Sequence, residues 1–452
     1  MRIVQIKVSP LELLDVQACD ITIRPNEHGG AYIRGIVDSA RKDEYIRYLL
    51  SEDTVVITGV DSDGGETALF AGMPEEFAFG EQNSLITMEL TLKSPTLRMD
   101  RLVRSRSYQS EELTYEDILI SLGGYPNYGA ILNCGDEVTI PHIIVQFIET
   151  DWMFLKRLAS HFGAMLLPEC KSGYTRYYFG LPERKSAGEW TAGHRTTLGV
   201  SGGGGAYLQI KVQRRDTHEI GEHVIMDGAE RIITELSTVW LGQELVYTYT
   251  LSDPRQLRVP RLENPTLTGG SLPGRITAVR GAEVQVSLDI DEEDSFPVGA
   301  CWLPFASAYS APDGSGWYAM PEEGDAARVM FPDRDEKNAF VESAVHLTAS
   351  GEARANPRLK SFRNSAGKEL LLAPGEMIMT NNNGMRIAIK DGEGISITSD
   401  KAVNIAGRAL TVTSGGDVNI AGDENVALQN SDAQMDASGR VGVGGQRVNV
   451  NE

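Results

Sequence analysis

The sequence predicts a mainly β protein with an α+β N-terminal region, a small β-barrel and a C-terminal run of short strands. Three observations predict this class. Glycine is frequent, with 47 residues among 452, which is typical of turn-rich β-structure rather than helical bundles. Short segments of alternating apolar residues recur along most of the chain. From Gly367 onward, a short repeat of apolar pairs replaces the mixed composition of the preceding residues.

Composition excludes several classes of protein. The formal net charge is −21, from 42 basic and 63 acidic residues, so the surface repels phosphate backbones and nucleic acid is not an expected partner. The sequence contains no run of 18 apolar residues, so no membrane-spanning helix is expected. The first residues lack the apolar core of a secretory signal, so we expect synthesis in the cytoplasm without a signal peptide. The four cysteines are scattered and are expected to be reduced thiols.

The N-terminal region, residues 1–265, combines strands with two helices. Val4, Ile6 and Val8 alternate as in a strand. Thr114 and Thr150 are each positioned as the N-cap of a helix. The helix after Thr150 is expected to bury one apolar stripe, formed by Trp152, Leu155, Leu158, Ala159 and Phe162.

A barrel-sized segment follows at 266–348. Residues 254–273 contain four prolines and two glycines, which indicates a domain edge. Two alternating segments then meet at Arg280-Gly281, the pattern of a hairpin. Further short strands separated by turn residues bring the total to about five, which fits a small closed barrel. The acidic run at 289–294 is interpreted as a solvated hairpin end.

The C-terminal repeat consists of apolar-x-apolar units whose first members lie seven or eight residues apart. Such a period suits one strand and one corner of a β-helix. Either one chain forms every face of its own coil, or three chains wind around one another. The three-chain form is favoured, because neighbouring chains would pair the strand edges along the whole repeat. The members expected to form the core are Ile387, Ile389, Ile395, Ile397, Val403, Ile405, Leu410, Val412, Val418, Ile420, Val426, Leu428, Val441, Val443, Val448 and Val450.

No catalytic or metal-binding constellation emerges from the sequence. His218 and His223 are five residues apart, so they do not share a helical face as zinc-protease ligands do. The glycine run at 201–206 has no following Lys-Ser/Thr and leads into a strand, unlike a phosphate-binding loop. We therefore expect no enzyme activity, no cofactor and no metal.

Several strings resemble the VgrG and phage tail-spike family of contractile injection systems. The first is PHIIVQFIETDWMFLKRLASHFG at 141–163. The second is the barrel sequence, with Trp317-Tyr318, Met320-Pro321-Glu322 and Phe331-Pro332-Asp333 as its most specific parts. The third is SAGKELLLAPGE at 365–376. Together they cover essentially the whole length in the family's order.

The resemblance implies an architecture and a set of partners. Residues 1–265 would form a hub of tail-tube-like barrels, 266–348 an OB-fold barrel, 349–366 a linker and 367–452 an intertwined, trimeric, triple-stranded β-helix spike. Some phage members carry a lysozyme domain between the barrel and the spike, and the linker at 349–366 is too short to contain one. A PAAR-like tip protein is expected on the last repeats, at Val441, Val443, Val448 and Val450. Tail-tube and baseplate proteins and the target cell envelope complete the expected partners.

The function that this resemblance implies is mechanical. The chain would be a structural hub-and-spike protein, the central trimeric baseplate hub and membrane-piercing needle of a phage tail, tailocin, type VI secretion system or extracellular injection particle. It would be assembled at the baseplate of that particle and delivered to the target envelope. The alternative is a carbohydrate-active β-helix enzyme or adhesin.

Overall fold

The computed structural model describes residues 2–82, 85–191, 194–200, 206–291, 300–342, 355–424, 426–429 and 434–437. The chain divides into two compact units, Met1–His346 and Leu347–Glu452, and each is described by itself. Strands hold 46% of the residues and helices 11%, which confirms the predicted mainly β class. Among the described residues, no helix has the length and apolar character needed to cross a membrane.

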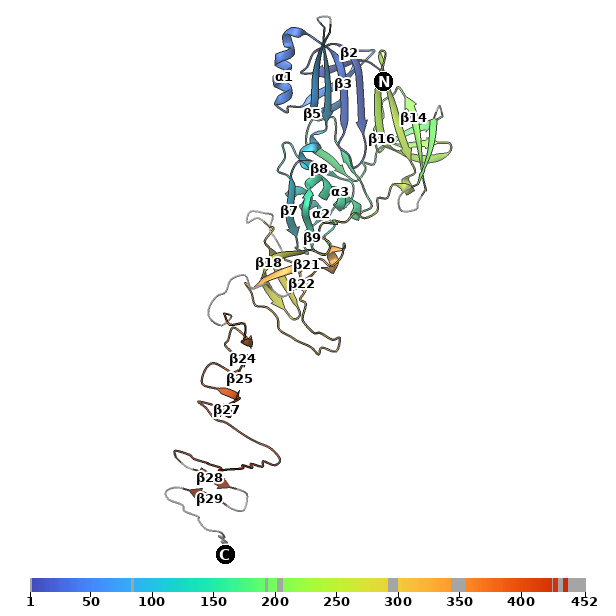
Figure 1. The fold of residues 1–452 in the computed structure, drawn as a ribbon. Helices are drawn as coiled ribbons and strands as arrows, with labels where there is room; N and C mark the ends of the chain where they lie inside the picture. Colours follow the sequence, from blue (N-terminus) through green and yellow to red (C-terminus); the bar gives the residue numbers. More distant parts are fainter. Residues whose placement is uncertain are drawn as a thin grey trace. The chain divides into compact units, whose positions relative to one another are not determined.

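The first unit is built on one 12-stranded sheet. Its path runs β1-β4-β5-β6-β3-β2-β16-β17-β14-β13, and β15 connects β12 to β16. Its strands are β1 (Ile3–Ser9), β2 (Leu13–Ile23), β3 (Gly30–Val37), β4 (Val55–Asp61), β5 (Glu66–Gln82), β6 (Leu85–Lys93), β12 (Ser186–Trp190), β13 (His194–Val200), β14 (Ala206–Arg214), β15 (His223–Met226), β16 (Ala229–Leu241) and β17 (Glu244–Ser252). Figure 1 shows α1 (Lys42–Leu50) beside this sheet near β5. Strands from both halves of the path contribute to one continuous apolar core.

The alternation expected in β1 is correct at two of its three positions. Ile6 and Val8 are buried, but Val4 is 38% exposed and Ile3 is fully buried instead. The pairing of β1 with β4 shifts register between Ile3 and Gln5. A bulge inserts one extra residue and reverses the side of the sheet that preceding side chains face.

Two capped helices lie between β6 and β12, in the part of the chain that separates the two groups of strands of the large sheet. Thr114 caps α2 (Tyr115–Ser121) in a capping box with Asp117. Thr150 caps α3 (Asp151–His161) by accepting a hydrogen bond from the Met153 amide. Both N-caps were predicted. The expected single stripe on α3 is too narrow, because Phe154, Arg157 and Ser160 are buried as well.

Smaller sheets surround these helices. One joins β7 (Val103–Tyr108) to β9 (Ile144–Thr150), and the other has the order β10-β11-β8, with β8 (Gly129–Leu132), β10 (Leu166–Pro168) and β11 (Arg176–Phe179). The 3₁₀ helices are η1 (Ser39–Arg41), η2 (Pro95–Asp100), η3 (Pro254–Gln256) and η4 (Glu336–Asn338).

The predicted five-stranded barrel is present. Its order is β20-β19-β18-β21-β22, with β18 (Ser271–Arg280), β19 (Glu283–Leu288), β20 (Leu303–Pro304), β21 (Ala326–Met330) and β22 (Phe340–Glu342). A parallel bridge between Phe305 and Val341 closes the sheet, and the Ala306 amide donates to the Val341 carbonyl at 2.7 Å. The hairpin predicted at Arg280-Gly281 joins β18 to β19. This five-stranded, partly open arrangement is that of an OB-fold.

The second unit contains an antiparallel meander. Its strands are β23 (Lys360–Arg363), β24 (Glu369–Ala373), β25 (Glu376–Thr380), β26 (Arg386–Lys390) and β27 (Gly394–Thr398), and each pairs with the next. Further along, β28 (Val426–Gln429) pairs with β29 (Gln434–Ala437). Figure 1 labels β24, β25 and β27 in the orange part of the chain.

Candidate functional site: an apolar strand face and a buried charged junction

The meander aligns the apolar pairs of the repeat into two rows on one face. Side chains two residues apart share a face of a strand, and the antiparallel register places partners opposite one another. The pairing aligns Leu370, Met379, Ile387 and Ile397 in one row and Leu372, Met377, Ile389 and Ile395 in the other. The opposite face of the same strands carries Ile378, Ala388 and Ser396.

Both rows are open to solvent in the single chain. Exposure ranges from 40% at Leu370 to 73% at Ile395. The face is therefore a contiguous apolar surface of the kind that soluble proteins cover with a partner. The prediction that these side chains form a buried core therefore concerns an assembly of several chains and not the single chain.

The repeat continues beyond β27 without a strand. Residues 399–424 are all described, and none of them belongs to a helix or strand. Val403, Ile405, Leu410, Val412, Val418 and Ile420 are all exposed along this segment. Backbone groups need hydrogen-bond partners, and within this segment the Asp400 amide donates to the Gly384 carbonyl and the Lys401 amide to Ser399 Oγ, but no strand pairing is present. Val426 is half-buried in β28. The side chain of Leu428 and the residues Val441, Val443, Val448 and Val450 lie outside what the structure describes.

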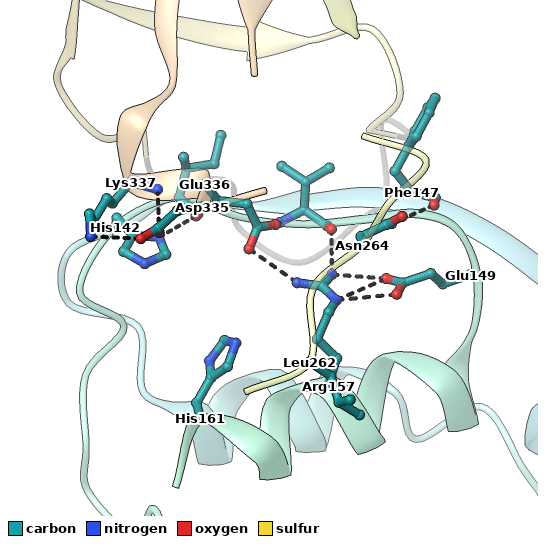
Figure 2. Close-up of polar contacts among 12 residues, drawn as sticks. His142, Phe147, Glu149, Arg157, His161, Leu262, Asn264, Asp335, Glu336 and Lys337 are labelled. Carbon is teal, nitrogen blue, oxygen red and sulfur yellow. Dashed lines mark hydrogen bonds and ion pairs between the residues drawn. The ribbon is translucent and has the colours of Figure 1, made fainter. Parts of the chain in front are cut away.

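A second feature is the junction between the α3 region and the barrel. Arg157, 2% exposed, projects from α3 between Glu149 of β9 and Glu336 of η4. Its Nη2 donates to Glu149 Oε2 at 2.8 Å, and its Nη1 donates to Glu336 Oε2 at 3.1 Å. Figure 2 shows the guanidinium between the two carboxylates.

Backbone groups of Val145 complete this cluster. The Val145 amide donates to Glu336 Oε1 at 2.8 Å, and Arg157 Nη2 donates to the Val145 carbonyl at 2.7 Å. Burial by itself lowers the pKa of the Arg157 guanidinium, but the charges of Glu336 and Glu149 outweigh burial and raise it. Burial raises the pKa of Glu336, although Arg157 and the Val145 amide act in the opposite direction. The cluster thus links a helix, a strand and the barrel through buried charges.

Two neutral contacts reinforce the same junction. Asn264 Nδ2 donates to the Phe147 carbonyl at 2.8 Å, and the Leu262 amide donates to Ser160 Oγ at 2.8 Å. These bonds attach the segment that leads into the barrel to β9 and α3, and Figure 2 shows the bond between Asn264 and Phe147.

His161 lies on the α3 side of the junction and is neutral. Burial, followed by the charges of Arg261 and Arg157, lowers its pKa to about 3. Its Nδ1 is 2.8 Å from the Tyr115 hydroxyl.

Asp291 corrects the interpretation of the acidic run as a solvated hairpin end. Its carboxylate accepts hydrogen bonds from the Ser107 amide at 2.6 Å and the Ser107 hydroxyl at 2.7 Å. Burial raises the pKa of Asp291, although both hydrogen bonds act in the opposite direction. This residue therefore fastens the end of β19 to β7, while residues 292–294 lie outside the described part of the chain.

No protein-family model and no curated protein matches the chain. Solved structures do. One is the E. coli c3393 protein, described as a component of the type VI secretion system with structural similarity to the T4 bacteriophage tail proteins gp27 and gp5. The TM-score is 0.52 at 15% identity, over 75% of this chain and 99% of that one. The Francisella PdpA-VgrG complex in its half-lidded form matches with a TM-score of 0.58 at 10% identity, over 88% of each chain. Its lidless form gives 0.55 at 10% identity, over 86% of this chain and 94% of that one.

The chain has a VgrG-type fold. At these identities the similarity is one of fold. It agrees with the resemblance noted in the sequence.

The residues of the junction in this VgrG-type fold were not singled out from the sequence. Glu149 and Arg157 lie within the string at 141–163, and Glu336 lies within the barrel sequence, both of which carried the resemblance. The sequence carried no signal for Arg157, because another charged residue, Lys156, stands beside it between Leu155 and Leu158. Within the described residues, no group of three or more His, Cys, Asp or Glu side chains could hold a metal ion.

Proposed function

We propose that this chain is the structural hub-and-spike protein of a contractile injection system. Three copies would form a baseplate hub from residues 1–265 and a piercing needle from the C-terminal repeat. The VgrG-type fold supports a structural role in a tail or baseplate, because the similar solved structures include a type VI secretion component described as similar to phage tail proteins.

The apolar strand face carries the proposal of a trimer. Its two rows are exposed, and the repeat continues through residues 399–424 as extended chain with no strand pairing. Two further copies would supply both missing elements, an apolar interior for the rows and strand partners for the backbone. Three intertwined chains would also resist extraction under load, because many backbone bonds would have to break together.

The charged junction supports the mechanical part of the proposal. A needle that meets a cell envelope transmits force back through the barrel to the hub. Arg157, Glu149 and Glu336 join these parts through charge-assisted hydrogen bonds that water does not reach. A mechanical role of this kind requires rigid contacts between the barrel and the hub, and it requires no catalytic site.

The partners of the proposed assembly follow from this role. They are tail-tube and baseplate proteins at the hub, a PAAR-like protein at the tip and the envelope of the target cell. The protein would be made in the cytoplasm and incorporated into the injection particle at its baseplate.

Two substitutions in one repeat unit test the trimer. Ile405→Asp places a carboxylate in the proposed interior, and Asn404→Asp adds the same charge at the neighbouring position, which faces the other way. Burying an unpaired carboxylate in each of three chains costs several kcal/mol per chain. Light scattering coupled to size exclusion should give a trimer for the wild type and Asn404→Asp, and smaller species for Ile405→Asp.

Two results would contradict the proposal. A monomeric wild-type protein would remove the trimer altogether. Equal trimer yields from the two Asp variants would show that the Ile405 face is not the interior.

A further inference from the structure

The connection between β20 and β21 forms a hairpin of its own. The Trp317 amide donates to the Tyr309 carbonyl at 2.8 Å, and the Ala311 amide donates to the Ser315 carbonyl at 2.9 Å. Gly316 has a φ of +144°, and a Cβ there would lie 2.4 Å from the Tyr309 carbonyl oxygen, so only glycine fits. Long connections with internal structure are commonly functional.

This hairpin exposes three aromatic side chains. Tyr309 is 55% exposed, Trp317 63% and Tyr318 74%. One of them, Trp317, lines a groove of about 510 Å³ together with Phe305, Ala308, Ala319 and Glu342 of β22. Aromatic side chains that stay exposed around a groove indicate a binding surface.

Hydrogen bonds within the chain occupy several polar side chains of the hairpin, those of Ser307, Asp313, Ser315 and Tyr318. Ser307 Oγ is 2.8 Å from the carbonyls of Tyr309 and Trp317. Asp313 accepts from the Ser315 amide at 2.9 Å and from its hydroxyl at 2.7 Å. The Tyr318 hydroxyl donates to the Gly281 carbonyl at 3.0 Å. Sugar or nucleic-acid recognition needs polar groups directed at the ligand, so these contacts favour an apolar protein surface as the occupant.

Charge identifies which protein surface fits. Residues 305–321 contain one charged residue, Asp313, whereas charged residues make up 23% of the chain. Copies of a chain with a net charge of −21 repel one another, so they approach most favourably through uncharged surface. Tyrosine and tryptophan are also the side chains enriched at the centres of protein interfaces.

We propose that the aromatic hairpin, residues 305–321, docks on a second copy of this chain. This inference rests on the proposed trimer. Glu342, which lines the groove, is the last residue of β22, and the C-terminal unit that is proposed to join the copies follows it in the chain.

Hydroxyl-radical footprinting of the full-length protein tests the docking. Trimer and monomer fractions, the latter from Ile405→Asp, are labelled with a free tryptophan peptide added as an internal standard. Mass spectrometry should show that Trp317 and Tyr318 are labelled several-fold more slowly in the trimer than in the monomer.

A double substitution, Trp317→Ser with Tyr318→Ser, gives an independent readout. It should raise the concentration at which the trimer dissociates several-fold and lower the monomer's unfolding temperature only slightly, through the loss of the hydrogen bond from the exposed Tyr318 to Gly281. Tyr174→Ser is the matched control, because Tyr174 is an exposed aromatic residue elsewhere in the first unit.

The outcomes separate this inference from the proposed function. Equal labelling in a trimer whose strands β26 and β27 are protected would overturn the hairpin docking alone. Protection in the monomer as well would mean that the hairpin packs within its own chain, which also overturns it. A wild-type monomer in light scattering would refute the trimer and the docking together.

Discussion

Arg157→Met tests whether the charged junction holds the barrel to the rest of the first unit. Methionine keeps most of the volume and removes the guanidinium, so Glu149 and Glu336 remain buried without a counter-charge. Removing one partner of a buried ion pair costs about 3–5 kcal/mol. The Val145 carbonyl also loses its donor from Nη2, which adds to the cost.

Thermal unfolding of the full-length protein measures this loss. The expected fall in Tm is roughly 5 °C or more, given the size of the unit. Arg101→Met is the matched control, because Arg101 pairs with Glu52 at 2.7 Å on the surface. Exposed pairs contribute about 1 kcal/mol or less, so this variant should unfold close to the wild type.

The pH dependence sharpens the test. Without Arg157, one of the two buried carboxylates can become neutral by taking up a proton, and burial already raises the pKa of Glu336. The penalty of Arg157→Met should therefore be smaller at pH 5 than at pH 8. The reasoning fails if the variant is no less stable than Arg101→Met, or if its penalty does not change with pH.

Four further outcomes are expected. Thr150→Ala removes the N-cap of α3 and should cost about 1–2 kcal/mol in chemical denaturation, with an unchanged midpoint counting against the cap. Because the pKa of Asp291 is raised in the folded state, its contribution to stability declines as pH rises above the unfolded value. Asp291→Asn should consequently gain stability relative to the wild type between pH 4 and pH 7, and a constant difference in unfolding free energy would argue otherwise. Deleting 441–452 should preserve the trimer but abolish capture of a PAAR-like protein in pull-downs, whereas equal capture would place the tip contact elsewhere. Purified protein should release no fragments from peptidoglycan, and clearing that a single acidic substitution removes would reveal an enzyme.

The capped helices and the barrel could be predicted because their signals are local. Thr114 and Thr150 act on amides three residues away, and the Arg280-Gly281 turn joins adjacent strands. The bulge in β1 has no comparable signal, because it depends on the register that β4 imposes.

The eight-residue period of the repeat was compatible with more than one arrangement. A five-residue strand and a three-residue turn, as in β26 and its turn to β27, repeat with the same period as one side of a β-helix. The meander of β23–β27 was therefore not foreseen, although the apolar pairs share one face of it. The period determines which side chains share a face of the strands, but it does not determine which strands form hydrogen bonds with one another.

The sequence by itself determined the mainly β class, the helix caps, the five-stranded barrel and the apolar rows of the repeat. Each of these follows from residues close together in the chain, through periodicity, capping or turn chemistry. Only the tertiary structure decided which charges are buried. Arg157 and Glu336 are 179 residues apart, and neither differs in sequence from a solvated surface residue. They meet because the barrel packs on α3. The two charges are buried at this contact, and their ion pair helps to hold the barrel to the helix.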